Sequence, residues 1–457
     1  MAAHLVSSVG NTGFMAEVVR VGDLNGDGAY ELLFAQSDPC TREVTCLTAT
    51  DLFGSVLWQF GEPSPANRYT YSDLAVQVHD WDGDGRLEVL WVEQAIYADS
   101  IVWDYATAGH IRVQTTRRGE LRGRTGWAQE GAERYEGEAI VHILDGATGQ
   151  EKGTLALPAP ADDCLAFANL TGDPGRRDLV VKDRYWNMWG VAHDGTALWH
   201  WPGNTGHYPA IADVNGDGFD EVYVGATLLS HEGQVMWQHD GLPHQDVSCA
   251  VTSGEETRLV FSHGEGEPHN GGVRCYDVGG REIWHREAGH AQYLVPGRFI
   301  PGMPEPQFAV ADIGWATPSG PRTRPAICLY DWNGVELWRQ EHPDEDSSLV
   351  IKRIDWLGRE DAQCLVLIVG SFDAATQTLE SKSPVVLDGE GLVQDELPMV
   401  SADGRTLGDC TYLVPVDVCG DLREEAVLTG KQGLCIYTNA ALRETPDAYN
   451  ATAYGGR

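Results

Sequence analysis

The chain has 457 residues and a formal net charge of −36, with 68 acidic side chains against 32 lysines and arginines. A chain this acidic is a poor partner for nucleic acid, because phosphate binding needs a basic face. The hydrophobic fraction of 42% is enough for a large core, but no run of about 18 apolar residues predicts a membrane-spanning helix. We therefore expect neither a nucleic-acid-binding protein nor a membrane protein.

The beginning of the chain lacks the basic segment and apolar core of a signal peptide. The ten cysteines include no CxxC pair, and many lie in apolar, strand-like sequence. This pattern favours buried free thiols in a reducing compartment over disulfides or a zinc site. Together the two features predict a cytoplasmic protein, or a secreted one if a signal peptide precedes this sequence.

An acidic loop recurs three times along the chain. It begins at Asp23, Asp80 and Asp213, reads Asp-x-Asn/Asp-Gly-Asp-Gly, and ends in a glutamate at the same offset in each copy. Oxygen-bearing side chains at alternating positions, with glycines that let the backbone turn, suit a hard cation such as Ca2+. We expect this Ca2+ to be structural, and a further catalytic Ca2+ stays open. The predicted calcium ligands are Asp23, Asn25, Asp27, Glu31, Asp80, Asp82, Asp84, Glu88, Asp213, Asn215, Asp217 and Glu221.

Three degenerate copies of the loop follow the same pattern. The copy from Asn169 is longer than the others. The copy from Asp417 has Cys419 at its third position, and the copy from Asp355 has Arg359 at its fifth. With an arginine at this position, the last copy is predicted to bind no metal.

A glycine-centred hairpin with the pattern Gly-x-x-Leu-Trp, or a relative of it, recurs downstream of the loops. Each glycine is expected in a tight turn between two strands. Clear copies span 53–58, 194–199, 232–237, 279–284 and 333–338, and weaker ones span 146–149 and 388–391.

Loop and hairpin together define a repeating unit of four strands. Four-stranded units repeated every ~40–50 residues are typical of a β-propeller. We predict an all-β chain with a single propeller domain over 1–457, built from eight four-stranded blades, with seven blades as the alternative. An insertion is expected at about 95–137. The last unit is short, which predicts that the N-terminal segment completes its sheet.

Loops of an antiparallel propeller alternate between the two faces of the ring. The loops between strands 1 and 2 share one face with the strand 3–4 hairpins, so the calcium loops are expected there. The strand 2–3 and 4–1 loops reach the other face. Three adjacent 4–1 loops carry a histidine at matching positions: His207, His244 and His290. Because strand 1 is innermost, we expect these histidines around the central depression, as a site rather than as isolated structural residues.

Further polar residues reach the same face through the 2–3 loops. Lys182, Arg184 and Tyr185 follow the second strand of the third unit, and His263 and His269 follow that of the fifth. The alternative is that these side chains, at the ends of strands, have a structural role only and form ion pairs or packing contacts with neighbouring residues.

The insertion of the second unit is rich in arginine and aromatic residues. Its candidate binding residues are Arg124, Arg134 and Trp127, because this loop could cover the central depression and guanidinium groups pair bidentately with carboxylates. The alternative is an exposed loop whose arginines have no specific role.

Two stretches carry a resemblance to a known family. One reads Asp417-Val-Cys-Gly-Asp-Leu-Arg-Glu-Glu-Ala-Val and continues in Leu434-Cys-Ile-Tyr-Thr438; the other runs from Ala212 through the third acidic loop to His244-Gln-Asp246. With them the chain resembles the rhamnogalacturonan lyases of polysaccharide lyase family 11, over most units from about 165 to 439. The family usually has Gly-His-Gly-Asp where this chain has Pro-His-Gln-Asp, so a sister family of calcium-binding propeller uronate lyases fits as well.

The resemblance implies a calcium-loaded propeller that cleaves a uronate-containing oligo- or polysaccharide by β-elimination. Such a reaction needs a cationic group at the uronate carboxylate, a base for the C5 proton and an acid for the leaving oxygen. The predicted base is His207 or His244, with Lys182 as second choice. Arg184 or an arginine of the insertion is predicted at the carboxylate, and Tyr185 or Tyr208 is predicted as the acid. The predicted substrate-binding residues are His290, His263, His269, Arg124, Arg134 and Trp127.

Other functions stay open on the same face. A glycoside hydrolase would commonly need two carboxylates about 5–10 Å apart, for which Asp183, Asp246, Glu265 and Glu267 are available. A non-catalytic propeller that binds a glycan or a protein would explain the calcium loops without requiring aligned histidines. Three histidines could also hold a transition metal.

Overall fold

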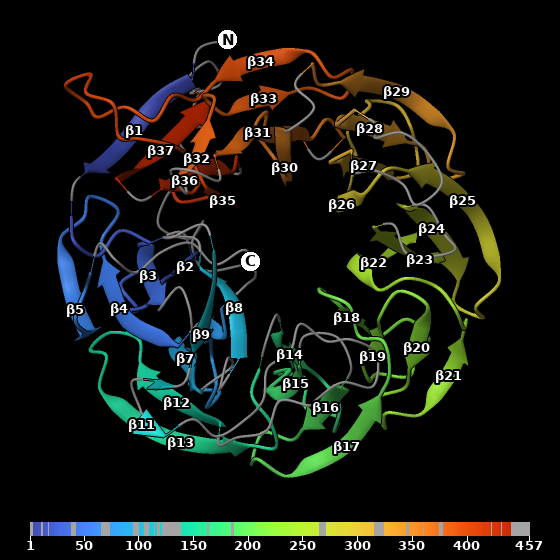
Figure 1. The fold of residues 1–457 in the computed structure, drawn as a ribbon, viewed down its shortest axis with the longest axis horizontal. Helices are drawn as coiled ribbons and strands as arrows, with labels where there is room; N and C mark the ends of the chain where they lie inside the picture. The colour runs from blue at the N-terminus through green and yellow to red at the C-terminus, as the bar shows by residue number, and fades with distance from the viewer. Residues whose placement is uncertain are drawn as a thin grey trace.

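Short apolar segments separated by glycine-rich turns form antiparallel strands, as the repeat predicts. In the computed structural model, eight sheets stand around a central axis (Figure 1). Seven of them are four-stranded, and the eighth has one further strand beside its four. The predicted all-β, eight-bladed propeller is confirmed, and the seven-bladed alternative is wrong. The described part of the chain has no helix long and apolar enough to cross a membrane.

The structure describes most residues between 3 and 439. The positions outside the description within this range are 11, 17, 38–42, 65–73, 95–99, 105–108, 114, 117–118, 121–138, 162–163, 184–186, 265–270, 315–323, 344–346, 360, 374–377, 422 and 431.

The first four blades follow one another along the chain, each with strand 1 innermost and strand 4 at the rim (Figure 1). Their strands are β2 (Val18–Gly22), β3 (Glu31–Ser37), β4 (Val44–Thr50) and β5 (Val56–Gly61) in blade 1; β6 (Val76–His79), β7 (Glu88–Glu93), β12 (Ala139–Asp145) and β13 (Glu151–Leu157) in blade 2; β14 (Leu165–Ala168), β15 (Asp178–Lys182), β16 (Asn187–Val191) and β17 (Ala197–Pro202) in blade 3; and β18 (Ala210–Ala212), β19 (Glu221–Tyr223), β20 (Thr227–Leu229) and β21 (Val235–Gln238) in blade 4.

The second half of the ring continues in the same order. Its strands are β22 (Gln245–Ser253), β23 (Glu256–His263), β24 (Gly271–Asp277) and β25 (Glu282–Ala288) in blade 5; β26 (Ala291–Gly297), β27 (Gln307–Asp312), β28 (Ala326–Tyr330) and β29 (Glu336–Glu341) in blade 6; β30 (Ser347–Ile354), β31 (Cys364–Asp373), β33 (Val385–Leu387) and β34 (Val393–Glu396) in blade 7, with β32 (Thr378–Ser381) beside β31; and β35 (Tyr412–Val416), β36 (Glu425–Gly430) and β37 (Gly433–Asn439) in blade 8.

The N-terminal strand closes the ring. β1 (Ala3–Gly10) pairs antiparallel with β37, in a register that runs from Ala3 opposite Asn439 to Gly10 opposite Gly433. It is the outer strand of blade 8, as the short last unit predicts. The closure joins the first and last strands of the described chain in one sheet.

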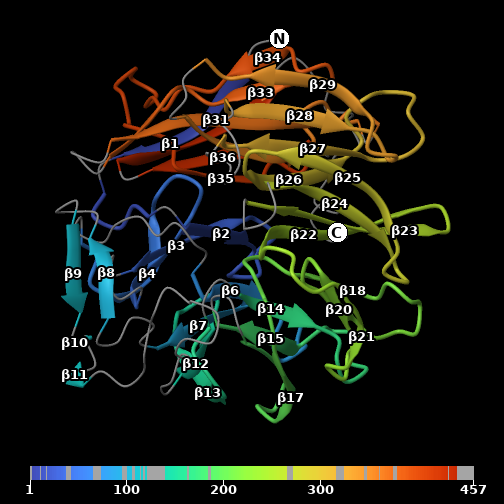
Figure 2. The same ribbon diagram turned by 45° about the vertical axis from the view of Figure 1, so that its right-hand side comes forward.

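The insertion in blade 2 lies between β7 and β12. Its described parts are two hairpins, β8 (Ser100–Asp104) with β9 (Gly109–Val113), and β10 (Thr115–Thr116) with β11 (Gly119–Glu120). Figure 2 shows the β8–β9 hairpin standing clear of the four-stranded sheet of its own blade. The insertion is therefore an addition to the blade rather than part of it.

Tryptophans of the repeated motif link neighbouring blades. The indole Nε1 of Trp199 in blade 3 donates to the backbone oxygen of His231 in blade 4 at 2.8 Å, and the ring lies against Gly233, where a Cβ would come within 2.5 Å of it. Glycine and tryptophan recur together because each tryptophan packs on the hairpin of the next blade. The other indoles of this kind belong to Trp58, Trp237, Trp284 and Trp338, which donate to the backbone oxygens of Gly146, Val278, Trp332 and Gly389.

Buried apolar residues fill the space between adjacent blades. Blades 5 and 6, for example, share a cluster that includes Val260, Cys275, Phe308 and Cys328. All nine cysteines in the described part of the chain are free, and six of them are buried. The prediction of free thiols is confirmed for these residues.

Candidate active site

Three 4–1 loops bring the predicted histidines together. His207 follows β17, His244 precedes β22 and His290 precedes β26. The imidazole rings of His207 and His244 lie 5.9 Å apart, edge to face, and Nε2 of His290 lies 3.2 Å from Oδ2 of Asp246. We refer to His207, His244, His290 and Asp246 as the histidine cluster. The acidic 1–2 loops emerge from the opposite ends of the inner strands, so they lie on the other face of the ring.

Backbone hydrogen bonds between consecutive blades fix part of this cluster. The N–H of His207 donates to the oxygen of Gln245 at 2.9 Å, and the N–H of Tyr208 donates to the oxygen of Asp246 at 3.2 Å. Gly206 adopts a φ of 55°, and a Cβ there would lie 2.3 Å from the oxygen of Gln245. The loop before blade 4 can approach β22 this closely only because this residue is glycine.

Asp246 is the buried carboxylate of the cluster, with 5% of its surface exposed. Burial by itself raises the pKa of Asp246, but the hydrogen bond from His290 and the nearby imidazoles of His290, His207 and His244 bring that pKa below its usual range. Asp246 is therefore an anion at neutral pH. Its carboxylate contacts Nε2 of His290 and so orients this ring.

His290 is also held through its backbone. Its N–H donates to Oδ1 of Asp312 at 2.9 Å, and the N–H of Gly289 donates to Oδ2 of the same carboxylate at 3.0 Å. A Cβ at Gly264 would come within 2.6 Å of the His290 ring, so the 2–3 loop of blade 5 confines the ring from a third side. The position of this imidazole is set by two blades.

The other side chains of the cluster are more accessible. His244 is exposed and His207 is half-buried, and Tyr208, 39% exposed, lies with its ring 6.4 Å from that of His207. Imidazoles are the side chains best suited to accept a proton near neutral pH. His207 and His244 thus offer a base, and Tyr208 beside the cluster offers a phenol, to a molecule at the surface.

Two predicted site residues lie inside blades. Lys182 ends β15 with 0% exposure, and its Nζ donates to the backbone oxygen of Asp183 at 3.1 Å. His263 ends β23, is equally buried, and contacts the oxygen of Gly264 through Nδ1 at 2.9 Å. Burial, with Arg274 nearby, lowers the pKa of His263 to about 4. His263 is therefore a neutral, enclosed imidazole, and neither side chain is presented to solvent.

Six predicted site residues lie outside the described part of the chain. They are Arg184, Tyr185, His269, Arg124, Trp127 and Arg134. Their predicted roles stay predictions.

Polar residues on the inner strands belong to the same region but were not predicted. Burial and the proximity of Asp246 and Tyr412 raise the pKa of Tyr293 on β26 to about 12. On the far side, Nη1 of Arg20 on β2 lies 3.3 Å from the phenol oxygen of Tyr412 on β35. Their positions on strand 1, which lines the axis, are the signal that could have found them.

The acidic loops of blades 1 and 4 have matching geometry. In blade 4, Oδ1 and Oδ2 of Asp213 accept the N–H groups of Gly216 and Gly218 at 2.7 and 3.0 Å. Glu221 is 1% exposed, and burial together with Asp217 and Asp213 raises the pKa of its carboxyl to about 7. A buried carboxylate crowded by two others, in an all-oxygen set of side chains, fits a divalent cation that would offset their charge.

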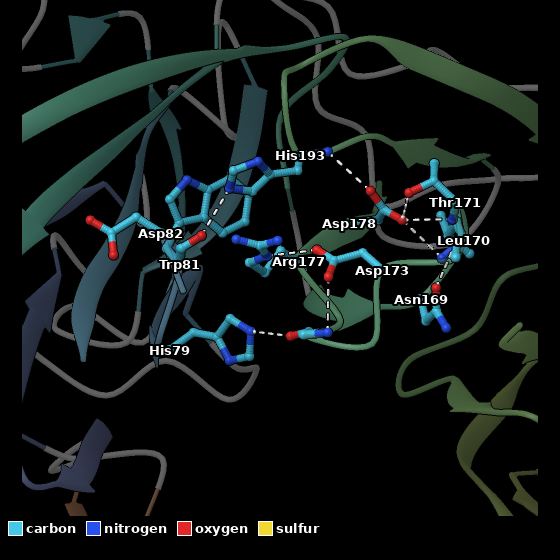
Figure 3. A network of polar contacts seen from close by, with 12 residues as sticks. His79, Trp81, Asp82, Asn169, Leu170, Thr171, Asp173, Arg177, Asp178 and His193 are labelled. Atoms are coloured by element: carbon cyan, nitrogen blue, oxygen red, sulfur yellow. Dashed lines mark hydrogen bonds and ion pairs between the residues drawn. The ribbon is translucent and has the colours of Figure 1, made fainter. Parts of the chain in front are cut away.

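The loops of blades 2 and 3 contact each other (Figure 3). Nε2 of His193 lies 2.8 Å from the backbone oxygen of Trp81, and Nε2 of His79 lies 3.0 Å from that of Gly175. In the degenerate loop of blade 3, Nε of Arg177 pairs with Oδ2 of Asp173 at 2.6 Å. An arginine of this degenerate loop thus pairs with one of the loop's own carboxylates.

The comparisons with known proteins agree with this architecture. No family model matches the sequence. The rhamnogalacturonan endolyase YesW of Bacillus subtilis (strain 168) is 23% identical over 367 residues, covering 71% of this chain and 54% of YesW. The rhamnogalacturonan exolyase YesX of the same organism is 25% identical over 319 residues, covering 60% of this chain and 49% of YesX. The chain therefore spans about half the length of the curated relatives it matches.

The solved structures include the same relatives. The crystal structure of YesW superposes with a TM-score of 0.58 and 20% identity, covering 95% of this chain and 74% of that chain. The chain is an eight-bladed propeller of the same fold as this lyase. The resemblance to rhamnogalacturonan lyases predicted from the loops and the C-terminal strands is confirmed.

Proposed function

We propose that this protein is a polysaccharide lyase that cleaves rhamnogalacturonan-type chains next to a uronic acid by β-elimination. The histidine cluster carries the proposal: histidines from adjacent 4–1 loops gather beside one buried carboxylate. The substrate class is supported by the similarity to two rhamnogalacturonan lyases.

The cluster suits the proton transfers of the reaction. We assign the base that removes the C5 proton to His207 or His244, whose rings are in contact and within reach of solvent. Tyr208, next to His207, is the candidate acid for the leaving oxygen. His290 is held by Asp246 and by the backbone contacts of Asp312, so we assign it to substrate positioning rather than to proton transfer.

The substrate carboxylate has to be neutralised as the C5 proton leaves. Arg184 and the arginines of the insertion remain our candidates for a direct bidentate contact. Ca2+ in the 1–2 loops would act on the opposite face, where it supplies charge balance to the loops.

Hydrolysis is less well supported by the described carboxylates. Asp246 is buried and paired with His290. Asp183, 3% exposed, accepts hydrogen bonds from both the backbone N–H and Nδ2 of Asn187. Neither is available as the second carboxylate that an inverting or retaining hydrolase uses.

The decisive experiment is incubation with rhamnogalacturonan, polygalacturonate and a neutral glycan, with and without Ca2+. The proposal predicts chain cleavage of the first substrate with ultraviolet absorbance from a C4–C5 unsaturated uronide. Saturated reducing ends would indicate a hydrolase. Measurable glycan binding without any product would indicate a binding module, and either result would reject the proposed lyase.

A further inference from the structure

The acidic loop of blade 2 differs from its two counterparts at the third position. Asp82 stands there, whereas the loops of blades 1 and 4 have Asn25 and Asn215. In both of those loops the asparagine Nδ2 donates to the glutamate that ends the loop, at 2.9 Å to Glu31 and 2.9 Å to Glu221. An ionised aspartate has no proton to donate, so the blade 2 loop needs another donor at this point.

Lys152 is that donor. Its Nζ lies 2.5 Å from Oδ2 of Asp82 and 2.8 Å from Oε1 of Glu88, which is 1% exposed. A lysine side chain is an ammonium ion at neutral pH, so Lys152 forms an ion pair with each of the two carboxylates. Carboxylate oxygens of Asp80, Asp82 and Glu88 lie within 4.8 Å of one another. The lysine therefore binds two of the three carboxylates that could hold a metal ion together.

Lys152 occupies a position that recurs around the ring. The register between β12 and β13 shifts so that Lys152 is the extra residue of a β-bulge. The same shift makes Leu57 the extra residue in blade 1 and Met236 in blade 4, and both are exposed apolar side chains. A lysine thus accompanies the loop with the additional carboxylate, and apolar residues accompany the two loops with asparagine.

Basic side chains also serve the degenerate loops. Arg177 pairs with Asp173 in blade 3, at 2.6 Å, and Nε of Arg423 donates to Oδ1 of Asp421 in blade 8, at 3.1 Å. Arg177 lies near the blade 2 loop as well, since its Nη1 would be 2.9 Å from a Cβ at Gly83. Basic side chains that pair with the carboxylates of these loops, in place of metal ions, therefore recur in this chain.

We propose that the Lys152 ammonium takes the place of a divalent metal ion in the blade 2 loop and maintains the conformation of this loop without metal. The loops of blades 1 and 4, in contrast, depend on Ca2+. A metal ion that enters the blade 2 loop has to displace the ammonium from Asp82 and Glu88. This loop therefore binds Ca2+ more weakly than the other two. The inference concerns metal dependence and is independent of the proposed lyase activity.

Hydrogen exchange of the wild-type protein tests the contrast directly. Backbone N–H groups of residues 23–31 and 213–221 are expected to exchange at least tenfold faster in EDTA than in Ca2+. Those of residues 80–88 should exchange equally fast in both. A loss of protection in 80–88 as large as that in the other loops would overturn the proposal. Equal protection of all three loops in EDTA would overturn it too, because the predicted contrast would be missing.

Terbium luminescence tests the displacement step, because Trp81 lies inside the blade 2 loop while blades 1 and 4 have Leu24 and Val214 at that position. The Trp81 signal is defined as the Tb3+ emission that Trp81→Phe removes. Lys152→Met, which copies Met236, should lower the Tb3+ concentration for half-maximal Trp81 signal at least tenfold. Lys152→Arg, which keeps a cation, should leave it within about twofold of wild type. An unchanged midpoint in Lys152→Met contradicts the proposal. If this variant does not fold, the hydrogen-exchange experiment on the wild-type protein tests the proposal instead.

Discussion

Oδ2 of Asp246 in blade 5 lies 3.2 Å from Nε2 of His290, which is in the loop between blades 5 and 6. The carboxylate comes from the start of an inner strand, and the imidazole comes from the loop that leads to the following one. A buried carboxylate that contacts an imidazole fixes the orientation of that ring within a site. His207 and His244 are also near enough to lower the pKa of this carboxyl group, so one buried anion lies close to three imidazoles.

Replacing Asp246 should affect the proposed activity more than the fold. We expect Asp246→Asn to lower kcat on rhamnogalacturonan by about 100-fold or more, because the amide keeps the shape but loses the negative charge that holds His290 in place. Steady-state kinetics across pH check this, with Glu232→Gln in an exposed hairpin as the matched control. An unchanged pH–rate profile with full activity would remove Asp246 from the site.

The two histidines in ring contact should not contribute equally. We expect His207→Ala or His244→Ala, whichever removes the base, to lower kcat by about 100-fold or more with KM nearly unchanged. Added imidazole should restore part of that activity. His4→Ala, on the exposed outer strand β1, controls for loss of a histidine as such. Full turnover by both variants would exclude them from proton transfer.

The architecture was predictable because each blade carries its own local marker. The glycine of one hairpin and the tryptophan of the preceding blade contact each other, as in Gly233 and Trp199, so both recur with every blade. Closure by the N-terminal strand was predictable as well, since the last unit had too few strands. The faces of the ring followed from antiparallel topology alone.

The contacts within the candidate site were less predictable. The direction of a side chain at the end of a strand depends on local backbone geometry, and Lys182 and His263 both turn into the interior. The Asp246–His290 pair joins separate loops, and only the packing of two blades brings its atoms together. The role of Lys152 was not predictable for the same reason. It depends on a β-bulge and on contact with Asp82, which lies in a different loop between strands.

The contact between Trp199 and Gly233 should be sensitive to a single methyl group. Gly233 has a φ of 74° and no room for a Cβ against the indole. We expect Gly233→Ala to lower the free energy of unfolding by about 2–4 kcal/mol, from left-handed backbone strain and overpacking together. Gly254, at a φ of 60° with open space around it, is the control, and Gly254→Ala should cost about 1 kcal/mol. Equal losses in urea denaturation would show that the indole contact contributes nothing.

Calcium should stabilise the fold through the loops of blades 1 and 4. We expect EDTA to lower the melting temperature, because an ion that binds only the folded state at 100 times its Kd adds about 2.7 kcal/mol. Asp213→Asn should remove part of the calcium-dependent increase, since Asp213 is a predicted ligand. Asp194→Asn, in a hairpin turn on the same face, controls for loss of a carboxylate. Loss of activity in EDTA at an unchanged melting temperature would contradict a structural role for the metal.

The buried imidazole of His263 should make the protein sensitive to mild acid. Its pKa is about 4 in the folded protein, against 6.5 ordinarily, because burial disfavours the charged ring. As the pH falls from 6.5 to 4, the unfolded chain takes up a proton that the folded protein does not. The free energy of unfolding should therefore fall by about 3 kcal/mol over this range, and His263 should not make it depend on pH above pH 6.5.

Urea denaturation at pH 7 and pH 4.5 should show a smaller difference in the free energy of unfolding for His263→Gln than for wild type. His4→Gln, which removes an exposed histidine, should behave as wild type. The same pH dependence in all three proteins would mean that His263 can be protonated without leaving its buried position.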